Sequence, residues 1–107
     1  MLDAEGNIKI IDFGLSTVLQ KNQLAQTYVG TCEYQAPEIV LRQEYERSVD
    51  FWSLGIVIYE MLFSTTPFFD QNVHKVHRNI LNNRVLFRRD LVIGKSREVF
   101  DLMDRLL

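Results

Sequence analysis

The sequence is poor in several features that would each point to a class of protein. It has one cysteine, so no internal disulfide can form and a reducing compartment is expected. Its net charge of −2 gives no reason to expect a nucleic acid or an anionic membrane as partner. The longest apolar stretch, near residues 54–59, is far shorter than the ~20 residues of a membrane span. The start "MLDAEGN" lacks the basic and apolar regions of a signal peptide. We therefore expect a soluble chain of the cytoplasm or nucleus.

What the sequence does contain is enough for a packed core. At 107 residues it can form one domain but not two. Hydrophobic residues make up 47% of the chain and aromatic residues 11%, which favours a globular protein over a disordered one.

The first third of the chain predicts little regular structure. "LDAEGN" is typical of a turn in which Gly6 and Asn7 take positive φ, and "IKII" (8–11) predicts a short strand. Only Met1 and Leu2 precede the turn, so this strand lacks a full hairpin partner. Residues 15–37 are polar and without period, which predicts a long loop. Loops longer than ~12–15 residues in a compact domain are usually functional.

The remainder of the chain predicts helices. "VDFWSLGIVIYEMLF" (49–63) is apolar on almost every helical face, so other protein should cover it on every side. Ser48 or Asp50 would favour its N-terminal end. Two later helices are indicated by apolar stripes, and Ser96 is a plausible N-cap of the second. The stripes consist of Val73, Val76, Ile80 and Leu81, and of Val99, Phe100, Met103, Leu106 and Leu107. No glycine or proline ends the last helix, so we expect a piece of a larger domain.

Three stretches carry a resemblance to a known family. They are "IIDFGLS", "TYVGTCEYQAPE" and "YERSVDFWSLGIVIYEMLFSTTPF", and together they resemble the C-terminal lobe of a eukaryotic protein kinase. Asp12-Phe13-Gly14 and Ala36-Pro37-Glu38 bracket a polar loop, as the family's motifs do. Asp50-x-Trp52-Ser53-x-Gly55 and Pro67-Phe68 follow at family spacing. Gly30 to Tyr34 resembles the Ser/Thr class, and residues 48–72 are most similar to the AGC group.

The resemblance implies an α+β fold: the mainly α-helical C-lobe of the protein-kinase fold, incomplete, with a short N-terminal β-strand and a long activation loop. Residues 1–107 would be a partial kinase domain that begins just before Asp-Phe-Gly and ends in a late C-lobe helix. The N-lobe and the catalytic loop would be missing.

The same resemblance implies ATP and Mg²⁺ as cofactors of the complete domain. Asp12 would be a magnesium ligand, because a hard cation takes oxygen ligands. Phe13 would pack beneath it, and Gly14 would permit the sharp backbone turn. A turn-forming Asp-x-Gly after a strand is the structural alternative.

Thr27 stands three residues before Gly30, where AGC-like kinases carry a phosphothreonine made by an upstream activating kinase. The phosphate would recruit basic side chains and order the loop. The chain departs from the family at Thr17, where a lysine is often found. An ordinary loop threonine is the alternative for Thr27.

Four further residues match family positions, and the partners of three of them, Thr31, Glu38 and Asp50, are absent from the sequence. Thr31 matches a supporting catalytic residue that bonds the catalytic aspartate and lysine. Glu38 matches the glutamate that pairs with a later arginine. Asp50 matches the residue that anchors the catalytic loop, and Trp52 is a structural member of the same motif. A buried carboxylate without its partner would be costly.

Substrate selection by resemblance involves two groups of residues. Tyr28, Cys32 and Gln35 match the pocket for the residue after the phosphoacceptor, and their polarity should weaken a demand for a large aliphatic residue. Glu60, together with Glu33, matches acids that bind an arginine upstream of the phosphoacceptor. For Glu60 the alternative is a helix-end acid that meets solvent or a structural arginine.

The pattern "HRNILNN" (77–83) is similar to a catalytic loop, but it follows Asp-Phe-Gly instead of preceding it. We expect His77 and Arg78 to be surface or packing residues. His74 and His77 have helical spacing, but no cysteine or carboxylate set joins them for metal binding.

The function predicted by resemblance is a protein serine/threonine kinase that transfers the ATP γ-phosphate to proteins with upstream basic residues. The chain alone would be inactive, because the Gly-rich loop, the strand lysine and the catalytic aspartate are not in it. A non-catalytic short chain that binds kinase substrates or regulators is the alternative. A third reading, a small binding domain with coincidental motifs, is the weakest.

Overall fold

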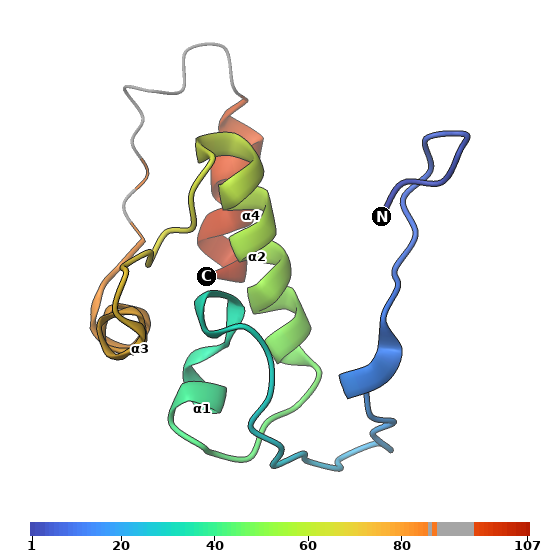
Figure 1. The fold of residues 1–107 in the computed structure, drawn as a ribbon, viewed down its shortest axis with the longest axis vertical. Coiled ribbons are helices and arrows are strands. Elements are labelled where there is room, and N and C mark those ends of the chain that lie inside the picture. The colour runs from blue at the N-terminus through green and yellow to red at the C-terminus, as the bar shows by residue number, and fades with distance from the viewer. Residues whose placement is uncertain (86, 88–95) are drawn as a thin grey trace.

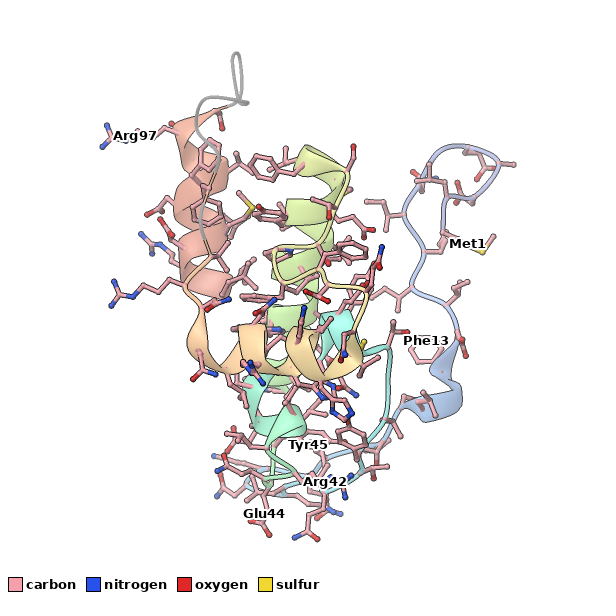
Figure 2. The ribbon with its side chains drawn as sticks, turned by 60° about the vertical axis from the view of Figure 1, so that its left-hand side comes forward. Met1, Phe13, Arg42, Glu44, Tyr45 and Arg97 are labelled. Carbon is pink, nitrogen blue, oxygen red and sulfur yellow. The ribbon has the colours of Figure 1, made fainter. Side chains whose placement is uncertain are left out.

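The computed structural model describes residues 1–85, 87 and 96–107. Within these residues the chain forms two 3₁₀ turns and four α-helices, and Figure 1 shows their arrangement. In chain order they are η1 (Phe13–Leu15), η2 (Cys32–Tyr34), α1 (Pro37–Val40), α2 (Ser48–Phe63), α3 (Val73–Asn82) and α4 (Arg97–Leu106). Helices α2 and α4 run side by side, and α3 lies crosswise to them (Figures 1 and 2).

Helix α2 begins one residue before the predicted helix and ends where predicted, so that prediction is confirmed. Its inner face buries Gly55, Ile56 and Tyr59 against α4 and η2. The part of the chain that the structure describes does not supply the cover on every side that this sequence favours, so cover by other protein stays a prediction. An opposite stripe remains exposed, because the described segments pack on one side of the helix only. The stripe consists of Phe51, Leu54, Val57 and Met61.

The core lies between α2, α3 and the segment that joins them. Ile56, Phe68, Val76 and Ile80 form one buried cluster. The Trp52 ring stacks on Phe68 with 5.9 Å between centroids and an interplanar angle of 3°. Fully burying an aliphatic or aromatic side chain of this size contributes ~1.5–3 kcal/mol. This cluster is therefore the main stabilising unit of the described structure.

Both predicted later helices are present. In α3 only Val76 and Ile80 are buried, while Val73 and Leu81 are exposed, so the inner face is narrower than the apolar stripe. The Asn72 side chain caps α3 by accepting a hydrogen bond from the His74 amide at 2.9 Å.

Helix α4 is held against α2 by its apolar stripe. Met103 is fully buried, and Ser96 is the N-cap residue by backbone position without a side-chain hydrogen bond. Leu107 lies on Gly55, where an added Cβ would come within 2.8 Å of a Leu107 methyl carbon. The close approach of the two helices therefore depends on the missing side chain at Gly55.

The N-terminal segment lies apart from the helices (Figure 1). The predicted turn is present, with Gly6 at φ +86°. Asn7 does not take a positive φ; its amide donates to the Asp3 carboxylate at 2.8 Å. The predicted strand over residues 8–11 is wrong, because only Ile8 forms a bridge, to Leu2. A two-residue arm offers too few backbone partners to extend the pairing.

The molecule is less compact than a typical domain of its length, because its N-terminal segment lies apart from the helices. The radius of gyration is 15.1 Å, whereas a compact domain of about this length has ~13 Å. Among the described residues, no helix combines the length and the apolarity needed to cross a membrane.

Candidate functional site

The corner at residues 12–14 is shaped by an aspartate. Asp12 is in the left-handed region, with φ 62° and ψ 70°, and precedes η1 as its N-cap. Its carboxylate accepts a hydrogen bond from the Gly14 amide at 3.4 Å. A Cβ on Gly14 would lie 3.3 Å from the same Oδ1. The turn therefore requires positive φ at Asp12 rather than at Gly14. Because Gly14 has no side chain, the Asp12 carboxylate can lie close to its backbone.

The corner is open to water. Phe13 is 66% exposed, so the expected packing of this ring beneath Asp12 does not occur. A magnesium ion takes about six oxygen ligands, several of them from water or phosphate. In the described residues, no cluster of three or more His, Cys, Asp or Glu side chains could hold a metal. Asp12 therefore fits the role of one ligand among several that the described chain does not supply.

The predicted long loop is held at its centre by the loop between α1 and α2. Ala25 and Tyr45 form an antiparallel bridge with two hydrogen bonds of 2.9 Å. The Gln26 amide donates to Glu44 at 2.6 Å, and the Tyr45 hydroxyl donates to the Thr27 carbonyl at 3.1 Å. Arg42, Glu44 and Tyr45 lie together at one end of the molecule (Figure 2). Thr27 is thus fixed through its backbone while its side chain remains exposed.

Tyr28 lies between two nitrogen-bearing side chains. The guanidinium carbon of Arg42 is 5.0 Å from the centre of the Tyr28 ring, a cation–π distance. The Tyr28 hydroxyl is 3.5 Å from Nε2 of His77 on α3. The sequence analysis named Tyr28, missed Arg42 and expected His77 to be a surface or packing residue.

Arg42 has an uncommon backbone conformation. It follows the last turn of α1 with φ 56°, where glycine or asparagine is usual. A residue with a larger side chain loses ~1–2 kcal/mol in this region. The arginine is therefore kept against the local preference of the backbone.

The residues around η2 have distinct environments. Thr31 is the N-cap of η2, exposed and without a capping side-chain bond, and Cys32 is half-buried against the core cluster. Gln35 is only 4% exposed. Its amide nitrogen donates to the carbonyls of Val29 and Gly30 at 3.1 and 3.2 Å. Gln35 thus supports the loop backbone beside Tyr28 from within the protein.

Glu60 is positioned by a tyrosine. The Tyr34 hydroxyl donates to Glu60 Oε2 at 2.7 Å. This bond, together with burial and the negative charges of Glu60 and Glu33, raises the pKa of Tyr34 to about 12. The Ser53 hydroxyl donates to the Tyr34 carbonyl at 2.9 Å and so fastens η2 to α2. Sequence reasoning missed Tyr34 and Ser53 as positioning residues, although both stand in the quoted motifs.

A known protein family matches this chain over its full length. Residues 1–107 match the model of the protein kinase domain. The chain belongs to the protein kinase family. It is 42% identical over 102 residues to serine/threonine-protein kinase YPK2/YKR2 of Saccharomyces cerevisiae, a match that covers 88% of this chain and 15% of the relative. It is 45% identical over 102 residues to serine/threonine-protein kinase Sgk1 of Bos taurus, covering 94% and 23%.

A third relative, serine/threonine-protein kinase SCH9 of Saccharomyces cerevisiae, is 44% identical over 98 residues, covering 91% of this chain and 12% of the relative. These relatives are Ser/Thr kinases of the AGC group, so the resemblance seen in the sequence is confirmed. The chain spans less than a quarter of the length of each of these three relatives. As a family, protein kinases use ATP and Mg²⁺ and act on proteins.

The remaining residues of the kinase motifs differ in their contacts and their exposure. Trp52 packs on Phe68, and its ring nitrogen is buried with no hydrogen-bond partner among the described residues. Glu38 is half-buried in α1, and Asp50 is exposed in the first turn of α2. No side chain of the described residues pairs with either carboxylate. The structure therefore places Cys32 within η2, Glu60 against Tyr34 of η2, and Gln35 directly after η2 with bonds to the backbone that follows Tyr28. These contacts do not include the Asp12 corner.

Proposed function

We propose that the chain is part of a serine/threonine kinase domain whose complete form transfers the ATP γ-phosphate to Ser or Thr in proteins with upstream basic residues. The observation that carries the proposal is the match of residues 1–107 to the protein kinase domain. The chain contributes one magnesium ligand, the activation loop and part of the substrate-binding platform. The alternative, a non-catalytic chain that binds kinase substrates or regulators, is an outcome of the test below.

Asp12 is the residue that would hold Mg²⁺, and its water-exposed carboxylate suits a hard cation. When bound, the ion neutralises charge on the ATP phosphates. Gly14 leaves room for the carboxylate and donates its amide to it. The roles of Thr31, Glu38 and Asp50 toward a catalytic loop and a later arginine are part of the same proposal.

Substrate arginine would be bound at Glu60. Tyr34 engages Oε2, while Oε1 has no hydrogen-bond partner among the described residues. A half-buried carboxylate with one unengaged oxygen suits a charge-assisted bond to a guanidinium. Glu33 adds negative charge beside the same tyrosine. These contacts support a preference for substrates with upstream basic residues.

Regulation would act through Thr27. Its exposed side chain is accessible to an upstream activating kinase, and the Tyr45 hydroxyl and the Ala25–Tyr45 bridge already hold the adjacent backbone. A phosphate adds about −1.5 to −2 charge at pH 7. This charge would order the loop by attracting basic side chains.

The test uses the native protein that contains these residues, isolated from its source. It is incubated with Mg²⁺, labelled ATP and two peptides that differ only in an upstream arginine or alanine. We expect transfer to the arginine peptide, and a loss of at least ~100-fold in Asp12→Asn, since a catalytic metal supplies several kcal/mol. Glu60→Gln should reduce the arginine preference about tenfold.

Arg97→Gln is the matched control, because Arg97 is exposed at the opposite end of the molecule from Arg42 (Figure 2). The proposal would be contradicted if Asp12→Asn kept its rate of phosphate transfer and the arginine and alanine peptides were phosphorylated equally. Binding of the arginine peptide without any transfer would favour the non-catalytic alternative.

A further inference from the structure

Positive charge is concentrated in one part of the chain. Residues 71–89 contain five Lys or Arg and no Asp or Glu, whereas the rest of the chain contains seven Lys or Arg and fourteen Asp or Glu. In the described part of this stretch, Lys75, Arg78 and Arg84 are all exposed. An acidic chain thus carries a basic surface at α3 and just after it. Lys75 and Arg78 lie on α3, Arg84 follows it, and Lys75 is 3.9 Å from the Asp70 carboxylate. Such asymmetry favours an acidic partner at that surface.

This basic surface adjoins the residues proposed to face substrate. His77 of α3 is 3.5 Å from the Tyr28 hydroxyl. His74 lies on the same side of α3 as His77, three residues away, and Arg78 lies four residues from His74 on the adjoining side. The face of α3 that carries His77 is therefore cationic or neutral throughout.

Arg42 approaches the same tyrosine ring from another element. Its guanidinium lies 5.0 Å from the ring centre. The nearest acid in sequence on its loop, Glu44, accepts a hydrogen bond from the Gln26 side-chain amide at 2.6 Å and forms no ion pair with Arg42 among the described residues. The Arg42 backbone has φ 56° just after α1, a left-handed helix ending at which glycine or asparagine is usual.

We propose that Arg42, supported by His77, selects an acidic residue directly after the phosphoacceptor. This inference rests on the proposed function, in which Tyr28 borders the pocket for that residue. A carboxylate in the pocket would accept charge-assisted hydrogen bonds from the guanidinium. The preferred substrate is then bipolar: basic upstream of the phosphoacceptor, for Glu60, and acidic immediately downstream, for Arg42.

Three peptides test the proposal with the native protein. They share the upstream arginine and the phosphoacceptor and carry Glu, Leu or Lys at the next position. We expect kcat/KM to be about tenfold higher for the Glu peptide than for the Leu peptide, and lowest for Lys. Arg42→Asn removes the cation and suits positive φ, so the backbone keeps its conformation. This variant should lose the Glu preference while the Leu peptide retains its kcat/KM.

Two further variants separate charge from structure. Arg42→Lys keeps the charge and should retain part of the Glu preference, whereas Arg97→Gln should leave all three peptides unchanged. Leu preferred over Glu, or an equal fall for both peptides in Arg42→Asn, would overturn the inference and leave the kinase proposal intact. Phosphorylation of none of the peptides would overturn the kinase proposal and the inference together. Matching melting curves of Arg42→Asn and the unmodified protein show that the variant is folded.

Discussion

Residues 1–24 of this kinase-family chain differ sharply from the described residues after position 31 in the contacts that hold them in place. None of residues 1–24 is buried, and their hydrogen bonds are short-range, such as those of the Asp3 carboxylate to the amides of Glu5 and Asn7. The second region contains the Ile56–Phe68 core cluster and the α2–α4 contact. Local hydrogen bonds can shape a turn without stabilising it much, because water competes for the same groups. The Asp12 corner is therefore shaped locally, and η2 is held by the core.

The largest effect that tests this contrast is expected for Phe68→Ala. Phe68 is 2% exposed and stacked on Trp52, so we expect the free energy of unfolding to fall by ~3–5 kcal/mol. Ile10→Ala, at a residue that is 83% exposed, should change it by less than ~0.5 kcal/mol. Urea unfolding measures both. If Phe68→Ala does not fold, Phe68→Leu is a smaller change at the same position. Equal losses of unfolding free energy at Phe68 and Ile10 would contradict the contrast.

A second prediction concerns the contact between α2 and α4. In Gly55→Ala the new methyl group would meet Leu107, and overpacking costs ~1–3 kcal/mol. Alanine regains ~1 kcal/mol of helix propensity, so the net loss should be about 1 kcal/mol. A double-mutant cycle with Leu107→Ala should show that the two changes are coupled. Additive effects would mean that the two residues do not meet in solution.

A third, similar effect is expected at the bond between η2 and α2. Tyr34→Phe removes the hydrogen bond to Glu60 and should cost ~1 kcal/mol at pH 7. The pKa of Tyr34 is raised to about 12 in the folded protein, against 10.0 for an ordinary tyrosine. The hydroxyl's contribution is therefore complete below pH 10 and is lost as the pH rises toward 12. Unfolding of both proteins at pH 7 and pH 11 checks this, and a difference that grows with pH would have the wrong sign.

The smallest effect is expected in the N-terminal region. Gly14→Ala places a methyl group 3.3 Å from Asp12 Oδ1 and disturbs the corner. Because no buried residue depends on it, the free energy of unfolding should change by less than ~0.5 kcal/mol. NMR shifts of residues 12–16 should change while those of α2 stay constant. Propagation of the change into α2 would show that the corner is coupled to the core.

The helices were predictable because their apolar residues repeat with the helical period. Helix α2 was located to within one residue, and α3 and α4 follow their stripes. The strand at residues 8–11 failed because a strand needs a partner, which composition does not reveal. The pattern of α2 indicates a tendency to be buried, and the covering segments for its exposed face are not among the described residues.

The candidate site was predictable only where motifs exist. Asp12, Glu60 and the η2 residues follow from family motifs, and the structure adds how they are positioned. Arg42 carries no local signal in the sequence, because its role depends on a left-handed backbone and on a ring fourteen residues earlier in the chain. Contacts between distant segments such as these require the fold.

The stacking of Trp52 on Phe68 has a practical consequence for spectroscopy. Trp52 is the single tryptophan of the sequence, and it belongs to the core. Its fluorescence should therefore report the melting of the helical body while remaining blind to residues 1–24. The two other aromatic types do not replace it there, since Phe13 is the only aromatic residue before Tyr28 and emits weakly. A label attached near Asp12 would be needed to observe the corner in the same experiment.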